Sequence, residues 1–473
     1  MKKENEAMKK NHMIRWIALS MVCILSAGFT ACGQTTAPAS SSVAAEASAT
    51  AAKESSSAAA ESAPAEKANA VTLKMIEHSN QGTNDAVKGL NTAFMSKYPN
   101  IKVESTIIGT EQYAQMMQTR IAAADVDIFE LTCFNIVNPE WAKGLDTNAT
   151  VQYIENGDVL DLTGQPFVQN WDPSAIADAN TYKGKVYSLN IGKVAMNGVY
   201  YNKTMFEQNG IQVPSTWSEF TALCKKLQAA GISPMTGGGK DGWPIGMMWN
   251  GFVNTFEPDP AGFNKALWSG ERKFNDEKTL ALFDKMAEFA SYYEKGVTAV
   301  DYASVIGRFV AGKAAMMPDG TWQGAQITTA DPNFKFGYFC IPGDTAGAKP
   351  VQLAGKYDIG YAGYAKTKNA DAVLQWLDFL SQKDVYTEFV NANGFIPTMQ
   401  GITMNNAFIN SLAPINESFQ RNYENLGRSP KGIGKYGGFA ISELQMLGGS
   451  VATTKELADL AQKDWDTAIA AIK

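Results

Sequence analysis

Apolar residues recur with strand and helix spacing from about residue 71 onward. Three segments have the alternating or short apolar pattern of β-strands, namely residues 71–76, 101–108 and 127–131. Residues 87–98 and 110–121 repeat apolar positions at helical spacing, with Pro99 ending the first helix and Thr110 expected to cap the second. This strand–helix alternation is typical of βαβ units and predicts a parallel sheet.

The later part of the chain continues the α/β pattern. Thr216 and Glu219 stand three residues apart before an apolar repeat, which is the pattern of a helix capping box. A further amphipathic helix is expected over residues 276–294. The glycine-rich run at residues 237–240 has neither phosphate-loop nor dinucleotide-loop spacing, and we interpret it as a turn.

The first residues have a different pattern, which predicts a targeting signal rather than part of the folded body. Basic residues precede an apolar run over residues 14–25, and small residues lead from this run to Ala31. A charged start, a short apolar core and a small residue at the cut predict a secretory signal peptide over residues 1–31. The apolar run is too short and too interrupted for a transmembrane helix.

Cys32, directly after Ala31, refines this interpretation. The segment 29–32 resembles a bacterial lipobox, although Phe29 stands where leucine is usual. The resemblance implies that Cys32 is lipidated and becomes the new N-terminus, and two acyl chains would hold the protein firmly on the membrane. An ordinary signal peptide with a chance cysteine is the alternative. Residues 32–70, which are rich in alanine and serine, are expected to form a disordered tether.

Composition narrows the function of the remaining body. Without residues 1–31, which hold five Lys or Arg and two Asp or Glu, the chain has 36 basic and 45 acidic residues and a net charge near −9. An acidic body without a basic run is a poor nucleic-acid binder, so no nucleic-acid partner is expected. About 400 residues exceed what one core usually supports, which predicts two lobes.

Cysteine and histidine usage argues against several kinds of site. Cys133, Cys224 and Cys340 are distant from one another in sequence, so neither a disulfide framework nor a zinc site is supported. Cys224 lies on an apolar helical face and is expected to be a packed thiol. After residue 31 the chain contains one histidine, His78. We therefore expect no metal site and no cofactor.

Eight segments in order resemble one known family, the extracellular solute-binding proteins of bacterial ABC importers, in the branch that carries sugars and oligosaccharides. The segments are residues 98–104, 125–129, 184–187, 199–203, 214–219, 312–316, 320–322 and 337–342. The resemblance covers essentially everything after residue 70. It implies a binding protein rather than an enzyme, monomeric, lipid-anchored on the outer face of the cytoplasmic membrane, and a partner of the transmembrane subunits of an ABC permease.

The family also implies a fold class, the two-lobed α/β fold of periplasmic binding proteins of the maltose-binding type. Lobe 1 would comprise residues 71–195 with 355–395, and lobe 2 would comprise residues 196–354 with 396–473. The ligand would be held between the lobes, which are joined by crossing hinge strands and close upon it.

Candidate ligand contacts in lobe 1 follow two predicted strands. His78 and Asn80 come after the first strand, and Glu130 and Asn135 lie at or after the third. Ligands of α/β sheets bind beyond the carboxyl ends of strands, and these side chains can hydrogen-bond to sugar hydroxyls. The alternative is that they cap the helices that follow.

Candidate contacts in lobe 2 are mainly aromatic, because the C–H face of a sugar ring packs on an aromatic ring. Trp243 and Trp322 lie in loop-rich stretches, and the family resemblance implies an aromatic contact at Trp322. Asp319 either binds hydroxyls or caps its turn, and Tyr436 belongs to a glycine-rich stretch that would close one end of the cleft. Trp249 is expected in the core instead.

Two other functions are compatible with the sequence. A lipid-anchored carbohydrate-active enzyme needs only two carboxylates at working distance, which sequence does not exclude. A binder of the same fold for a polyamine would use Glu77, Glu130, Asp241 and Asp319 beside the aromatic residues. An amino-acid ligand is disfavoured, because the candidate segments contain no arginine to pair with a carboxylate.

Overall fold

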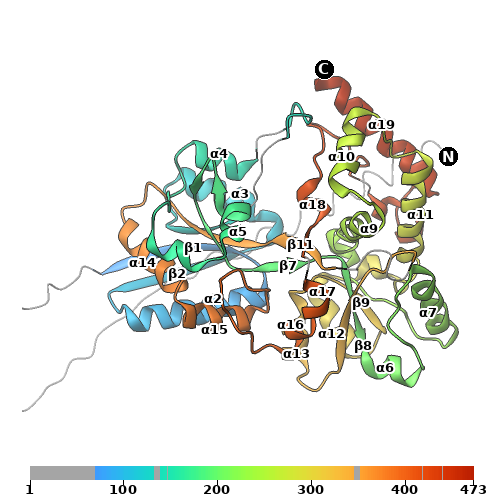
Figure 1. Ribbon diagram of the computed structural model, residues 1–473, viewed down its shortest axis with the longest axis horizontal. Helices are drawn as coiled ribbons and strands as arrows, with labels where there is room; N and C mark the ends of the chain where they lie inside the picture. Colours follow the sequence, from blue (N-terminus) through green and yellow to red (C-terminus); the bar gives the residue numbers. More distant parts are fainter. Residues whose placement is uncertain are drawn as a thin grey trace, which may run out of the picture. The chain divides into compact units, whose positions relative to one another are not determined.

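The fold follows from the computed structural model, which describes residues 70–132, 139–145, 148–345, 352–417, 419–438 and 440–472. All of these residues belong to the unit Lys67–Lys473. The predicted signal peptide, Cys32, the tether up to residue 69, and Asn135 lie outside the described residues. Within the unit, two sheets with separate cores are joined by a third, smaller sheet (Figure 1).

The first sheet has five strands in the order β2–β1–β3–β12–β6. Their bounds are β1 Val71–His78, β2 Ile101–Ile108, β3 Ile128–Thr132, β12 Ile359–Gly363 and β6 Leu189–Asn190. The prediction of parallel strands is confirmed for β1, β2 and β3. It is wrong for the sheet as a whole, because β12 runs antiparallel to both β3 and β6 and makes the sheet mixed.

Period-two alternation in these strands places helices on both faces of the sheet. Met75 and Ile128 pack in one core with α2 (Gln81–Lys97), α14 (Ala370–Leu380) and α15 (Lys383–Asn393). Ile76 and Phe129, one residue further along each strand, pack on the opposite face against α3 (Thr110–Ala122) and α4 (Ala149–Glu155). The expected role of Thr110 is wrong: it is the first helical residue, and the N-cap position belongs to Gly109.

The second sheet has three antiparallel strands in the order β10–β8–β9, with bounds β8 Gly198–Asn202, β9 Met316–Pro318 and β10 Phe336–Cys340. Val199 and Met316 point into the larger core, whose helices are α7 (Trp217–Ala229), α9 (Met248–Phe256), α10 (Pro260–Ser269), α11 (Glu277–Ala290) and α19 (Thr454–Ile472). Tyr200 and Met317 point to the other face, towards α12 (Val305–Val310), α13 (Gln323–Ala330) and α16 (Ala407–Ser411). The predicted core position of Trp249 and the predicted packed thiol of Cys224 are confirmed.

The capping box at the start of α7 is confirmed. Thr216 Oγ1 accepts from the backbone N–H of Glu219 at 3.2 Å, and Glu219 Oε2 accepts from the backbone N–H of Thr216 at 3.2 Å. We expect Thr216→Ala to lower the free energy of unfolding by about 1 kcal/mol, because one N-terminal N–H loses its acceptor. Urea denaturation measures this loss. Thr221→Ala, further along α7, is the control and is expected to change stability much less.

A small sheet in the order β13–β11–β7 connects segments that are far apart in sequence: β7 Lys193–Ala195, β11 Ala354–Tyr357 and β13 Gln420–Arg421. β7 continues within three residues into β8, and β11 is followed within two residues by β12, so these strands link the five-stranded sheet to the three-stranded one. Figure 1 shows β7 and β11 running side by side between the two groups of helices. Paired extended strands of this kind provide a hinge.

A second connection is made by residues 139–145, which follow β3 in sequence and precede α4. The ring of Trp141 lies 6.3 Å from that of Trp268 on α10, edge to face. Gly144 has a φ of +65°, and a Cβ there would lie 2.7 Å from Ile472 of α19. A segment that leaves and re-enters the five-stranded lobe therefore contacts helices of the other lobe.

We expect Trp141→Ala to increase the radius of gyration of the unliganded protein, since the lobes then lose one of the contacts that join them outside the hinge. Small-angle scattering measures this change. Val213→Ala, at a position 43% exposed, is the control. Identical scattering profiles for Trp141→Ala and the unmodified protein would contradict the expectation.

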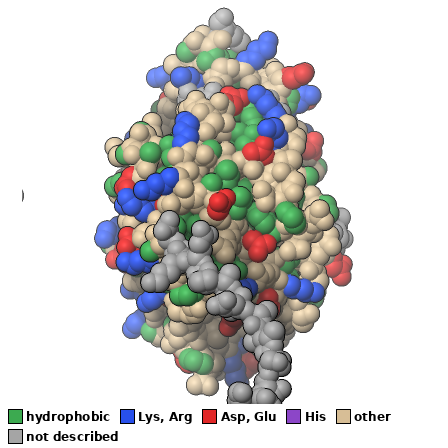
Figure 2. All heavy atoms as spheres, turned by 90° about the vertical axis from the view of Figure 1, so that its left-hand side faces the viewer, with side chains coloured by type: hydrophobic (Ala, Val, Ile, Leu, Met, Phe, Trp, Pro, Cys, Tyr) green, Lys and Arg blue, Asp and Glu red, His purple; other side chains and the backbone are tan. Residues whose placement is uncertain are grey.

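The surface mixes charges of both signs. Figure 2 shows Lys and Arg side chains interspersed with Asp and Glu on the face that it presents. Burial raises the pKa of the Cys340 thiol to about 12 and that of Cys224 further still. Within the described residues, no helix is long and apolar enough to cross a membrane. Among these described residues, no group of three His, Cys, Asp or Glu side chains is placed to hold a metal ion.

Candidate functional site

The carboxyl ends of β1 and β3 bring His78 and Glu130 together. Glu130 Oε2 accepts from the backbone N–H of His78 at 2.8 Å and lies 2.6 Å from its ring Nδ1. Burial would lower the pKa of His78, but the charge and hydrogen bond of Glu130 outweigh this effect and raise it. The imidazole side chain is 23% exposed, whereas Glu130 is only 4% exposed. Glu130 thus holds His78 in place, and part of the imidazole ring remains exposed.

Glu77 forms a second buried carboxylate beside this pair. It is 1% exposed, and the amide of Asn84 donates to its Oε2 at 3.2 Å. Burial, reinforced by the charge of Glu130, raises the pKa of Glu77 to about 7. Asn80 caps α2, since its Oδ1 accepts from the N–H of Thr83 at 3.5 Å. The capping role anticipated as an alternative for Asn80 is therefore present.

Tyr302 is the centre of the polar network in lobe 2. It lies in the short 3-10 helix Tyr302–Ser304, and its hydroxyl donates to Asp319 Oδ1 at 3.1 Å. The indole N–H of Trp322 donates to the same hydroxyl at 2.6 Å, and so does the amide of Gln323, also at 2.6 Å. One tyrosine hydroxyl thus joins three of the side chains that surround it.

Asp319 is fully engaged inside the protein. Its Oδ1 also accepts from the N–H of Gly320 at 2.7 Å, and its Oδ2 accepts from Gln323 at 3.2 Å. Burial raises the pKa of Asp319 to about 7, although hydrogen bonds from Gly320, Gln323 and Tyr302 counteract it. With an exposure of 1%, Asp319 supports its neighbours, and the structure gives it the turn-capping contact that was one of its two expected roles.

The two candidate tryptophans lie near each other. The ring of Trp243 is 4.6 Å from that of Tyr302 and 6.5 Å from that of Trp322. Trp243 is 38% exposed, which is unusual for so large an apolar side chain. Trp322 is half-buried and packs against the cores of both lobes. It therefore stands where the two lobes meet.

Tyr436 is held elsewhere. Its backbone N–H donates to Asp464 of α19 at 2.9 Å, and its ring carries the ammonium group of Lys435 at 4.6 Å. Within the described part of the chain, the partners of Tyr436 are Asp464 and Lys435 and not His78, Trp243 or Trp322. The structure thus does not bring it together with the other candidates.

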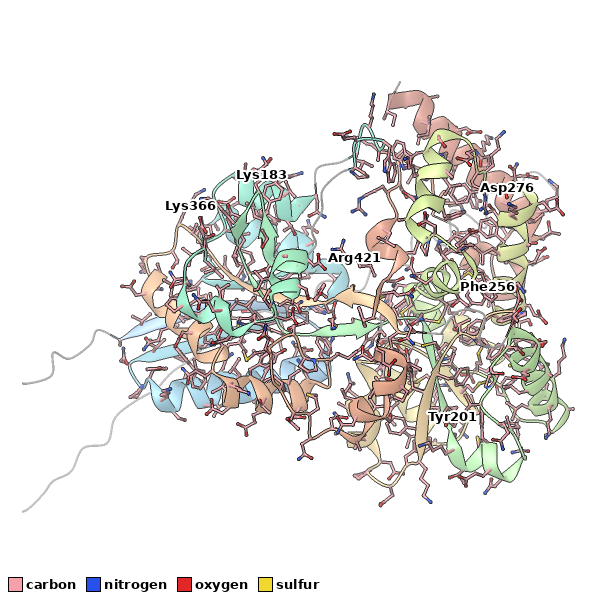
Figure 3. All side chains as sticks on the ribbon, in the orientation of Figure 1. Lys183, Tyr201, Phe256, Asp276, Lys366 and Arg421 are labelled. Atoms are coloured by element: carbon pink, nitrogen blue, oxygen red, sulfur yellow. The ribbon has the colours of Figure 1, made fainter. Side chains whose placement is uncertain are left out.

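Hinge residues approach the lobe 1 cluster. The charges of Asp358 and Lys356, which lie 3.5 Å from each other, both act on the pKa of His78. Arg421 of β13, labelled in Figure 3, forms an ion pair of 2.8 Å with Asp178. The charges of these hinge residues therefore act on His78, and an ion pair joins β13 to the segment at Asp178.

Several contributors had no clear signal in the sequence. Tyr302, Gln323 and Asn84 were not among the expected site residues, because none of them belongs to a quoted segment. In lobe 2, Gln323 Oε1 is a buried polar atom without a hydrogen-bond partner among the described residues. This atom leaves hydrogen-bonding capacity in the lobe 2 cluster.

The described residues form a two-lobed α/β fold, and comparison with solved structures confirms the predicted fold. A structure of RafE in complex with raffinose is similar with a TM-score of 0.65 and 19% identity, covering 84% of this chain and 99% of that chain. A chitin oligosaccharide binding protein gives a TM-score of 0.68 at 21% identity, covering 85% and 99%.

The predicted family is confirmed as well. The profile of the bacterial extracellular solute-binding proteins matches residues 80–387, and the chain belongs to this family. The multiple sugar-binding protein of Streptococcus mutans is 25% identical over 342 residues, which cover 69% of this chain and 76% of that protein. The melibiose/raffinose/stachyose-binding protein MelE of Bacillus subtilis is 24% identical over 303 residues, covering 62% and 67%. Family and relatives are binding proteins, and the family acts outside the cytoplasm.

Proposed function

We propose that this protein captures a sugar or oligosaccharide between its two lobes and delivers it to the transmembrane subunits of an ABC permease. The observation that carries the proposal is the position of Trp322, half-buried against both cores and next to Trp243. An aromatic platform at this place offers a surface for the C–H face of a sugar ring. His78, Asn80 and Glu130 in lobe 1 would supply polar contacts to hydroxyls, and Asn135 is proposed with them on sequence grounds.

The state of the buried carboxylates favours a neutral ligand over a polyamine. Glu130 is paired with His78, and Asp319 accepts from Gly320, Tyr302 and Gln323. Glu130 is paired with an imidazole whose pKa it raises, and burial raises the pKa of Asp319 to about 7, so neither residue adds a full uncompensated charge that would attract an ammonium group. The names of the relatives from S. mutans and B. subtilis, which mention sugars, support the same choice.

The lipid anchor belongs to the same proposal. Lipidation at Cys32 after removal of residues 1–31 would hold the protein on the outer face of the cytoplasmic membrane, close to a permease. Residues 32–70 would give the body a reach of about 35 Å if they behave as a flexible chain. Mass spectrometry of the protein purified from membranes tests the anchor, since Cys32→Ala should abolish the lipid and release the protein.

A thermal-shift screen tests the binding function. The full mature chain is heated with a panel of mono- and oligosaccharides, together with spermidine as the cationic competitor. A ligand that binds the folded state alone should raise the melting temperature in proportion to the logarithm of its concentration. A shift with a neutral sugar that persists at high salt supports the proposal. A salt-sensitive shift with spermidine alone overturns it in favour of a polyamine.

Product analysis of the same mixtures separates binding from catalysis. A binding protein should return every oligosaccharide unchanged after long incubation. Release of shorter sugars would instead indicate a glycoside hydrolase, which needs two carboxylates at working distance. Appearance of such products with the purified protein would therefore overturn the proposal.

A further inference from the structure

We propose that Tyr302 is a positioning residue that fixes the indole of Trp322, so that Trp322 meets the ligand only through its ring face. The proposal rests on the sugar-binding function proposed above and specifies how one of its contacts is built. It starts from the hydrogen-bonding capacity of a single hydroxyl group.

The hydroxyl of Tyr302 is saturated by the protein itself. A tyrosine hydroxyl has one hydrogen to donate and two lone pairs that accept. The hydrogen goes to Asp319 Oδ1 at 3.1 Å, and the lone pairs receive the N–H groups of Trp322 and Gln323, each at 2.6 Å. No capacity is left for a ligand hydroxyl, and Tyr302 therefore acts through its neighbours.

The surroundings hold this hydroxyl in one orientation. Asp241 Oδ2 accepts from the backbone N–H of Tyr302 at 2.7 Å, which fixes the residue from its own main chain. Trp243 packs edge to face on its ring at 4.6 Å. Burial and the charge of Asp319 raise the pKa of Tyr302 well above its usual value, so the hydroxyl keeps the proton that it donates.

The consequence for Trp322 concerns the chemistry that it can offer. An indole has one polar group, its N–H donor, and here that group is used by Tyr302. What remains is the aromatic ring, half-buried between two cores and about 6.5 Å from Trp243. This arrangement selects the apolar C–H face of a sugar ring rather than a hydroxyl.

Tyr302→Phe tests the proposal, with Tyr338→Phe as the matched control. The Tyr338 hydroxyl also bonds to Asp319, but to its backbone oxygen, at 3.1 Å. Each substitution removes one hydroxyl next to the same residue, and only the first one releases the Trp322 indole. The indole N–H resonance of Trp322, assigned with Trp322→Phe, is recorded in unliganded protein, and sugar affinity is measured by calorimetry.

We expect Tyr302→Phe to shift the Trp322 indole resonance and to weaken sugar binding on the order of 10-fold, since a freed indole can rotate. Tyr338→Phe is expected to leave the resonance in place and the affinity within about twofold. An unchanged resonance and affinity in Tyr302→Phe overturn the proposal.

A measurement on the unmodified protein covers the case in which Tyr302→Phe does not fold. The Trp322 indole proton should exchange with solvent much more slowly than an exposed indole proton, because it is bonded to a buried hydroxyl. Exchange at the exposed rate overturns the positioning role. Since neither the resonance nor the exchange needs a ligand, a failure to bind any sugar would contradict the proposed function alone.

Discussion

Replacing Trp322 with alanine is expected to weaken sugar binding on the order of 100-fold while the unliganded protein remains folded. Truncating a central aromatic anchor typically costs about 2–3 kcal/mol of binding free energy, which corresponds to this factor. The substitution also frees the Tyr302 hydroxyl, which loses one of its two donors. Calorimetric titration with the best sugar from the thermal-shift screen measures the loss.

Two control variants make the result for Trp322→Ala interpretable. Tyr182→Ala removes an aromatic ring from the hairpin of β4 (Thr181–Tyr182) and β5 (Lys185–Val186), and it should leave affinity unchanged. Trp322→Phe keeps a ring and should retain more affinity than the alanine variant. If Trp322→Ala binds as tightly as the unmodified protein, the aromatic platform lies elsewhere. Melting temperatures of the unliganded variants show whether any loss reflects unfolding.

Glu77→Gln is expected to stabilise the protein at pH 8 and to flatten the dependence of its stability on pH. The pKa of Glu77 is raised to about 7 in the folded protein, whereas an unfolded chain ionises near 4.5. The native state therefore binds more protons between these values, and its stability falls as pH rises through them. The difference of pKa corresponds to a contribution on the order of 3 kcal/mol, which is lost above about pH 7.

Asp319 and His78 are expected to change the pH dependence of stability in the same direction as Glu77. Asp319 has its pKa raised to about 7, and the raised pKa of His78 gives a stabilisation that is complete below its unfolded value and lost at higher pH. Urea unfolding at pH 5.5 and pH 8 should show greater stability at the acidic value and a smaller difference in Glu77→Gln. Glu104→Gln, an exposed substitution on β2, is the control. Equal slopes for Glu77→Gln and the unmodified protein would show that Glu77 is not the buried acid assigned here.

Local sequence patterns correctly predicted the helix cap and the strands that depend on residues close together in the sequence. The capping box of Thr216 and Glu219 and the first three strands have their signals within a few residues, and the structure confirms them. β12 could not be placed in this way, because it joins β3 from more than 200 residues away and in the opposite direction. The N-cap of α3 was placed one residue too late, at Thr110 instead of Gly109, because both Thr and Gly occur at N-caps.

In the candidate site, too, some residues could be predicted from local patterns and others could not. His78 and Glu130 lie at strand ends that periodicity identifies, so their proximity followed from the predicted sheet. Tyr302 precedes Trp322 by 20 residues and lies in a short 3-10 helix, for which the sequence carries no strong signal. Its role depends on how a loop folds so that distant polar groups form hydrogen bonds with one hydroxyl. The periodicity of apolar residues does not predict such long-range hydrogen bonds.

The contact between Trp141 and Trp268 has a consequence for affinity. An empty receptor whose range of open arrangements is restricted loses less conformational entropy when it captures its ligand. Where the contact is kept in the closed arrangement, apparent affinity lies nearer to the intrinsic value, because a larger fraction of empty molecules is then competent to bind. The same restriction reduces the difference in shape between the ligand-free and the ligand-bound protein. The proposed permease would have to recognise the ligand-bound protein by this difference.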